Sequence, residues 1–135
     1  MKKWDMTEPY VGAHIRVEAG RLYHHGIYIG NDEVVQFGLP TDVYSDPKTV
    51  KVLRSPMADF LKGGFLEVRK FDRKELKQKN SDEEIVRIAL SKVGEGDYNI
   101  LTNNCEHFCN YCIFGKKISE QVSSVHDEVR KKLGL

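Results

Sequence analysis

Hydrophobic and polar residues alternate through much of the first seventy positions of the chain, a pattern typical of half-buried strands. Two of these runs are joined by Gly30-Asn31-Asp32, which predicts a hairpin. The predicted strands cover residues 13–18, 22–29, 33–37, 49–53 and 65–71, with a short helical turn over residues 57–62. The first half of the chain is therefore expected to form an antiparallel sheet.

The second half of the chain carries the signals of helices. Ser81 is followed by three acidic residues in the arrangement of a capping box, and apolar residues then recur at helical spacing until Gly94. A loop is expected over residues 94–101, and a final helix is expected after Ser119. Strands followed by helices, with no repeat or linker, predict a single α+β domain over residues 1–135.

Another helix is predicted between the loop and the final helix, from Cys105 to about Phe114. Asn103 or Asn104 can cap its first turn, and Gly115 is suited to end it. The antiparallel sheet is expected to pack against this helix.

Composition and charge are those of an ordinary globular protein of 135 residues. Twenty-one basic residues nearly balance twenty acidic ones, for a net charge of +1, so no overall field favours a nucleic acid as partner. No apolar run approaches the roughly 20 residues of a membrane span, and no secretory signal begins the chain. We expect a soluble cytoplasmic protein without a transmembrane segment, for which peripheral membrane contact stays open.

All three cysteines, Cys105, Cys109 and Cys112, lie within one predicted helix. Their odd number and helical spacing favour reduced thiols over a disulfide framework. Because they share a helical face, a metal site is the alternative, but a closed zinc site needs four ligands, usually from two segments. We therefore expect no metal and no cofactor, with Cys109 and Cys112 buried and unpaired.

Cys105 is the candidate nucleophile because it stands in the first turn of its helix. A thiol attacks as the thiolate, and the N–H groups and dipole of a helix N-terminus favour negative charge there. The same N–H groups can stabilise an oxyanion on an attacked carbonyl. The alternative is a small buried hydrophobic residue that happens to begin a helix.

The general base has to come from another segment. His107 points away from Cys105 on the helix and is expected to be a packing or surface residue. His14 and His126 have no supporting neighbours and are expected to be exposed. The remaining source is the pair His24-His25.

Adjacent strand residues face opposite sides, so at most one histidine of this pair faces the thiol. His24 is favoured because Gly26, on the same face, leaves room for another backbone or a substrate. Gln36, twelve residues after His24, is the candidate for the third group, which fixes the tautomer of the base. A three-residue loop would place Gln36 diagonal to His24, within reach of its side chain, whereas a two-residue loop would place it on the face of His25.

The two motifs together resemble those of the lecithin:retinol acyltransferase family. The segment His24-His25-Gly26-Ile27-Tyr28-Ile29-Gly30 is similar to the family's H-x-G-I-Y-x-G strand, and Asn103-Asn104-Cys105-Glu106-His107-Phe108 contains its N-C-E-H-F helix start. The resemblance covers roughly residues 10–118. The family is a permuted branch of the papain-like, NlpC-related thiol enzymes, with the histidine strand before the cysteine helix, which is also the order here.

The resemblance implies that Cys105 is the nucleophile and His24 the base. Where the family usually has a second histidine, this chain has Gln36, whose amide oxygen can orient an imidazole without carrying charge. Tyr23 lies near the position where related enzymes place an oxyanion-stabilising tyrosine, and Asn104 is the other expected supporting residue.

The activity that the resemblance implies is acyl transfer through a thioester on Cys105. Water as the acceptor gives a hydrolase, and an amine or alcohol gives an acyltransferase. The implied substrates are acyl-bearing lipid esters. Two alternatives stay open: a thiol hydrolase that cleaves amide or peptide bonds, and a non-catalytic binding or regulatory domain that keeps the fold.

Overall fold

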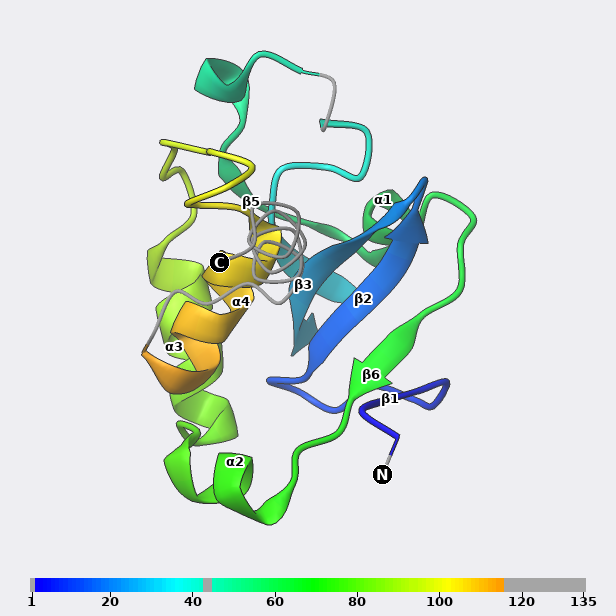
Figure 1. The fold of residues 1–135 in the computed structure, drawn as a ribbon, viewed down its shortest axis with the longest axis vertical. Helices are drawn as coiled ribbons and strands as arrows, with labels where there is room; N and C mark the ends of the chain where they lie inside the picture. Colours follow the sequence, from blue (N-terminus) through cyan, green and yellow to red (C-terminus); the bar gives the residue numbers. More distant parts are fainter. Residues whose placement is uncertain (1, 43–44, 116–135) are drawn as a thin grey trace, which may run out of the picture.

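The computed structural model describes residues 2–42 and 45–115, which form an antiparallel sheet with helices around it (Figure 1). The strands are β1 (Trp4–Asp5), β2 (His14–Ala19), β3 (Leu22–Gly30), β4 (Glu33–Phe37), β5 (Val52–Pro56) and β6 (Glu67–Arg69), in the spatial order β1-β6-β2-β3-β4-β5. The helices are α1 (Met57–Leu61), α2 (Arg73–Gln78), α3 (Asp82–Ser91) and α4 (Cys105–Phe114), with a 3-10 turn η2 (Pro47–Thr49). The predicted α+β class is confirmed. The helix expected after Ser119, and with it His126, lies outside the described residues.

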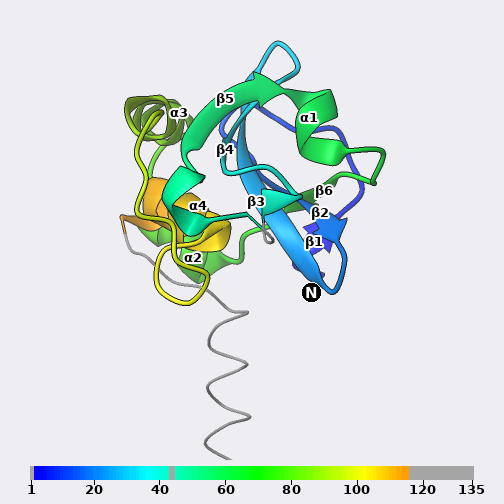
Figure 2. The ribbon, with the colours of Figure 1, turned by 90° about the horizontal axis from the view of Figure 1, so that it is seen from above.

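Helices cover both faces of the sheet (Figure 2). On one face, α3 and α4 pack against β3 and β4, and Ile27, Val35 and Cys109 belong to the same buried cluster. On the other face, α1 places Phe60 against Val34. Strand alternation explains this division, because the register partners Ile27 and Val35 point to one face and Val34 points to the other.

The turn between β3 and β4 is tighter than a three-residue loop. Asn31 and Asp32 have left-handed φ angles of 50° and 59°, which are typical of a two-residue hairpin turn. A register shift just before the turn adds one residue to β3 as a β-bulge. The register that pairs Gly26 with Gln36 is therefore the one predicted for the longer loop, and it puts Gln36 on the face of His24.

Gly26 makes room for a side chain of the protein. A Cβ at this position would lie 2.7 Å from Cγ1 of Val34 and 2.8 Å from Cε1 of Phe60, well inside the separation at which packed carbon atoms attract. Phe60 thereby reaches the ring of His24, with ring centroids 5.3 Å apart. The expectation that this glycine leaves space for a backbone or a substrate is wrong, because α1 fills the space.

Two predicted strands begin or end elsewhere. Asp46 caps η2 by accepting the N–H of Lys48, so the chain is turning at Thr49 and β5 begins at Val52. β6 contains only residues 67–69 of the predicted 65–71, and Phe65 before it is exposed. Pairing with a neighbouring strand sets these limits, and the hydrophobic pattern alone does not contain that information.

Three short elements were not predicted from the sequence: η2, α2 and β1. α2 begins with a reciprocal capping box of Asp72 and Glu75, a local signal that could have been recognised. β1 contains only Trp4 and Asp5 and exists because it pairs with β6. His14, expected to be exposed, is buried.

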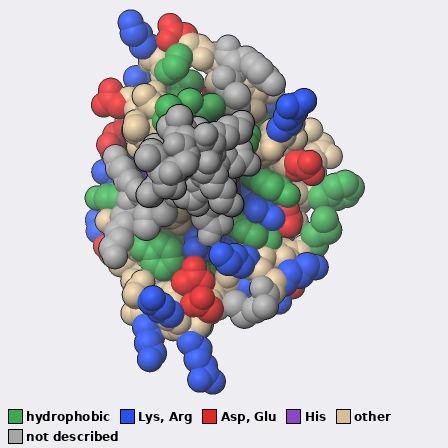
Figure 3. Space-filling model, viewed as in Figure 1, with side chains coloured by type: hydrophobic (Ala, Val, Ile, Leu, Met, Phe, Trp, Pro, Cys, Tyr) green, Lys and Arg blue, Asp and Glu red, His purple; other side chains and the backbone are tan. Residues whose placement is uncertain are grey.

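Charges of both signs are spread over the face shown in Figure 3. Lys and Arg side chains project at the end formed by α2, where Arg73, Lys74 and Lys77 are exposed. Within the described ranges, no helix has the length and apolar character needed to cross a bilayer.

Candidate active site

Cys105 begins α4, as predicted, and Asn104 is the residue that caps the helix. Oδ1 of Asn104 accepts the N–H groups of Glu106 and His107, each at 3.0 Å. In return, the N–H of Asn104 donates to Nδ1 of His107 at 3.2 Å. This reciprocal capping box fixes the first helical turn, in which the thiol stands, and gives the buried His107 a structural role.

Cys105 is largely buried at the wall of a cavity. Burial raises the pKa of this thiol to about 11. The backbone N–H of His25 opposes the rise, and the Glu106 carboxylate adds to it. The N–H groups of the helix N-terminus favour the thiolate, but desolvation outweighs them. At neutral pH, Cys105 is a neutral thiol.

Gln36 orients the ring of His24. Nε2 of His24 lies 2.7 Å from Oε1 of Gln36, and the amide nitrogen of Gln36 donates to Oγ of Ser55. With the amide oxygen toward His24, Nε2 carries the ring proton and Nδ1 keeps a lone pair. The predicted hydrogen bond is confirmed, and the full burial of Gln36 holds it in place.

His24 is uncharged at neutral pH. Burial lowers its pKa to about 4, while the hydrogen bond to Gln36 and the negative charge of Asp42 partly oppose that change. Its unprotonated Nδ1 can therefore accept a proton. The pair of Cys105 and His24 is a neutral thiol beside a neutral imidazole.

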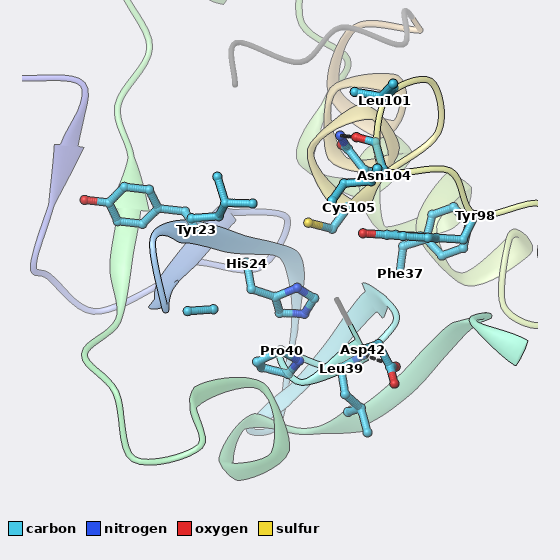
Figure 4. A pocket seen from close by; sticks show the side chains of 13 residues that line it. Tyr23, His24, Phe37, Leu39, Pro40, Asp42, Tyr98, Leu101, Asn104 and Cys105 are labelled. Atoms are coloured by element: carbon cyan, nitrogen blue, oxygen red, sulfur yellow. Dashed lines mark hydrogen bonds between the residues drawn. The ribbon is translucent and has the colours of Figure 1, made fainter. Parts of the chain in front are cut away.

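A cavity of about 170 Å³ brings His24 and Cys105 together (Figure 4). The pairing of β3 with β4 stops at Gly26–Gln36, and the cavity opens beyond that point. Figure 4 shows the sulfur of Cys105 and the ring of His24 directed into the same space from α4 and β3. The rest of the wall is largely apolar and includes Leu22, Phe37, Leu39, Pro40, Ile100 and Leu101.

Two polar residues of this cavity were not recognised from the sequence, Tyr98 and Asp42. The Tyr98 hydroxyl points toward Cys105 (Figure 4), and burial, followed by the neighbouring Cys105, raises the pKa of Tyr98 to about 12, so it remains a neutral donor. Asp42 accepts the N–H of Leu39 at 2.7 Å and the hydroxyl of Ser45 at 2.9 Å. Both residues come from irregular segments, where spacing gives no signal.

Tyr23 and His25 point elsewhere. Tyr23 lines the cavity, but Figure 4 shows its hydroxyl directed away from Cys105, and the guanidinium of Arg16 lies 3.7 Å from its ring centroid. The ring of His25 lies on the opposite face of β3 from His24, as strand alternation requires, and bonds to His14. The site thus contains Cys105, His24 and Gln36 of the predicted residues, with Asn104 capping the helix.

The other two thiols, Cys109 and Cys112, are buried and free, as predicted. Burial raises the pKa of Cys112 to about 12 and that of Cys109 well above the usual range. Across the described part of the chain, no group of three His, Cys, Asp or Glu side chains is arranged to hold a metal ion.

Comparison with known proteins gives a consistent match. The family model described as lecithin retinol acyltransferase matches residues 7–118. Lecithin retinol acyltransferase from Rattus norvegicus and that from Homo sapiens are each 29% identical to this chain over 136 residues. Each alignment covers 86% of this chain and 59% of the relative, so the chain spans less than two thirds of the length of these relatives.

Proposed function

This chain belongs to the lecithin retinol acyltransferase family, and on that premise we propose that it transfers acyl groups through a thioester on Cys105. The observation that carries the proposal is the placement of Cys105 and His24 on one apolar cavity, with Gln36 holding the ring of His24. The relatives are named as acyltransferases that act with lecithin and retinol. The apolar wall suits the acyl chain of a lipid ester, which is the substrate class that we propose.

The first half-reaction begins from the two neutral groups. As the sulfur of Cys105 attacks the acyl carbonyl carbon, Nδ1 of His24 takes the thiol proton. The carbon–oxygen ester bond then breaks, and the leaving oxygen takes the proton from the imidazolium. The products of this step are a thioester on Cys105, a free alcohol and neutral His24.

The second half-reaction returns the thiol. A water or alcohol enters, gives its proton to His24 and attacks the thioester carbonyl, and the sulfur leaves and regains the proton. Water makes the protein a hydrolase, and another hydroxyl or an amine makes it an acyltransferase. The order of the histidine strand and the cysteine helix corresponds to a permuted papain-like thiol enzyme.

We assign the oxyanion site to the Tyr98 hydroxyl and the backbone N–H of Cys105. A tetrahedral intermediate places negative charge on the former carbonyl oxygen, and donors aimed at that oxygen lower the barrier. The Tyr98 hydroxyl points toward Cys105, whereas the Tyr23 hydroxyl does not. Tyr23 keeps a supporting role through its place in the cavity wall.

Intact-protein mass spectrometry tests the proposal. The protein is mixed with dihexanoyl-phosphatidylcholine, quenched at early times in acid and weighed, and an N-hexanoyl amide is run in parallel. We expect a hexanoyl adduct from the ester with the wild-type protein and with Cys112→Ala, and none with Cys105→Ala. An adduct that persists in Cys105→Ala would overturn the role of the thiol. An adduct from the amide alone would favour the amide hydrolase, and binding without any adduct or turnover would favour a non-catalytic domain.

A further inference from the structure

A line of buried polar side chains crosses the face of β2 and β3 opposite His24. Nε2 of His14 lies 2.9 Å from Nδ1 of His25, and Nη1 of Arg69 lies 3.2 Å from Nδ1 of His14. At the other end, Nε2 of His25 lies 3.7 Å from Oε2 of Glu106, the residue after the candidate nucleophile. Both histidines are 1% exposed. The proposed acyl-transfer steps use none of these four side chains.

The direction of the hydrogen bonds follows from the arginine. A guanidinium only donates, so Nδ1 of His14 accepts from Arg69 and Nε2 of His14 carries the proton. Nε2 of His14 therefore donates to Nδ1 of His25, which leaves the ring proton of His25 on Nε2, facing the Glu106 carboxylate. Oδ1 of Asn110 accepts from the same Nη1 of Arg69, and Oε2 of Glu75 accepts from Nη2, each at 2.8 Å.

Burial, helped by nearby charged groups, keeps the two histidines neutral. Burial is the largest cause that lowers the pKa of His25 to about 3, and His24, Arg16 and Arg69 contribute to the same shift. Burial also lowers the pKa of His14 well below its usual value, with His25, Arg69 and Arg16 adding to the effect. Each neutral ring has one donor and one acceptor, which matches the chain of bonds.

The same residue, His25, connects the chain of buried side chains to the thiol through its backbone. The ladder between β3 and β4 stops at Gly26–Gln36, one residue short of His25. The backbone N–H of His25 instead favours the thiolate of Cys105, which opposes the rise in the pKa of that thiol. The ring of the same residue is held between His14 on β2 and Glu106 on α4, so the strand and the helix start are fixed against each other at this point.

We propose that the directed chain Arg69–His14–His25–Glu106 is a positioning device that fixes β3 against the first turn of α4, and so sets the place of the backbone N–H of His25 relative to the Cys105 thiol. His14 and His25 are positioning residues, and the N–H is a further donor for the thiolate during the reaction. The catalytic role of this chain rests on the proposed function. Its positioning role can be tested without that function, by measuring the reactivity of the Cys105 thiol.

Two substitutions of His14 separate the loss of its two hydrogen bonds from the replacement of its side chain as such. In His14→Gln, the amide oxygen can accept from Arg69 and the amide nitrogen can donate to His25, so the direction is kept. In His14→Leu, both bonds are lost. The readout is the rate of Cys105 alkylation by iodoacetamide between pH 6 and 10, followed by peptide mass spectrometry. We expect the profile of His14→Leu to move to higher pH and that of His14→Gln to stay near wild type.

The acylation assay adds a second readout. Small displacements of reacting groups can cost up to about a hundredfold in rate. We therefore expect His14→Leu to lower kcat well below the wild-type value with KM nearly unchanged. His14→Gln is expected to keep most of the wild-type kcat. Unchanged alkylation in His14→Leu would overturn the inference, as would equal impairment of both variants. If the wild type forms no acyl adduct, the proposed function fails, but the alkylation profiles still decide the positioning role.

A measurement on the wild-type protein covers the case in which His14→Leu does not fold. Long-range ¹H–¹⁵N NMR spectra of the histidine rings distinguish the two neutral tautomers. We expect His14 and His25 both to carry the proton on Nε2 from pH 6 to 8. A proton on Nδ1 of either ring would break the direction of the chain and overturn the inference.

Discussion

At the scale of single residues, burial decides the charge of the groups that face the cavity. The pKa of Cys105 is raised to about 11 and that of His24 is lowered to about 4, chiefly by burial. One pKa unit corresponds to about 1.4 kcal/mol, so proton transfer from sulfur to ring is strongly unfavourable before a substrate binds. We therefore expect the transfer to accompany bond formation. The orientation of His24 then matters more than any charge beside it.

Gln36→Ala tests the importance of this orientation. The variant removes the acceptor for Nε2 of His24, and we expect it to reduce acylation by roughly tenfold or more, while alkylation of Cys105 by a small electrophile continues. Gln36→His, which offers a ring nitrogen as acceptor, is expected to keep substantial activity. Alkylation lost in Gln36→Ala as fully as in His24→Ala would contradict a role limited to orientation, and unchanged turnover would remove Gln36 from the site.

At the scale of elements, the start of α4 and the end of the β3–β4 ladder create the site together. Asn104 fixes the first turn of α4, and the ladder stops at Gly26–Gln36, where the cavity opens. If the pairing of β3 with β4 continued past Gly26–Gln36, the strands would leave no space between His24 and the start of α4. The cap at Asn104 therefore positions the thiol as well as stabilising α4, and the end of the ladder leaves open the space that the thiol faces.

A comparison of Asn104→Ala with Ser81→Ala separates the effect of a helix cap on stability from its effect on the position of the Cys105 thiol. Ser81 caps α3 by accepting the N–H of Glu84 at 3.2 Å, away from the cavity. Loss of a helix cap costs about 0.5–2 kcal/mol, so we expect both variants to lower the free energy of unfolding in urea to a similar degree. Only Asn104→Ala is expected to change the alkylation rate of Cys105. An equal change in both variants would show that general loosening is responsible.

At the scale of the whole molecule, burial lowers the pKa values of His14, His24 and His25, so the fold holds these rings in neutral form. In the unfolded chain, each titrates near pH 6.5. Below that pH, the unfolded state binds protons that the folded state does not, so stability increases with pH across this range. The same burial that makes His24 neutral at the site therefore makes the fold sensitive to acid.

The expected result is a free energy of unfolding that is nearly constant above pH 7 and falls as the pH is lowered from 6.5 toward 4. Urea unfolding at pH 7.5, 6.5, 5.5 and 4.5 measures it. His14→Gln removes one titrating group and is expected to give a shallower fall, provided that the variant is folded at pH 7.5. A flat profile between pH 6.5 and 4.5 would contradict the neutral burial of these rings.

Local sequence was sufficient for the elements that local physics controls. The β3–β4 hairpin, a cap of α4 at Asn103 or Asn104 and the end of α4 at Gly115 were predicted because turn and cap signals lie within a few residues of the structures that they form, and the structure places the cap at Asn104. The capping box of α2 is equally local, because Asp72 and Glu75 are three residues apart. Cys105 was singled out by its place at a helix start, and the glycine beside His24 and the family resemblance favoured His24. The register that brings Gln36 to His24 was left open between two loop lengths, and the structure decided it.

Tertiary structure alone decided which of these groups are charged and what else surrounds them. Arg69 meets His14 across 55 positions of sequence, and Tyr98 and Asp42 reach the cavity from irregular segments. Local patterns report on neighbours in the chain, whereas these contacts depend on how the sheet and helices pack. Desolvation is likewise a property of the assembled core, so the sequence identified the thiol and the imidazole, and only the fold moved their pKa values apart, to about 11 and about 4.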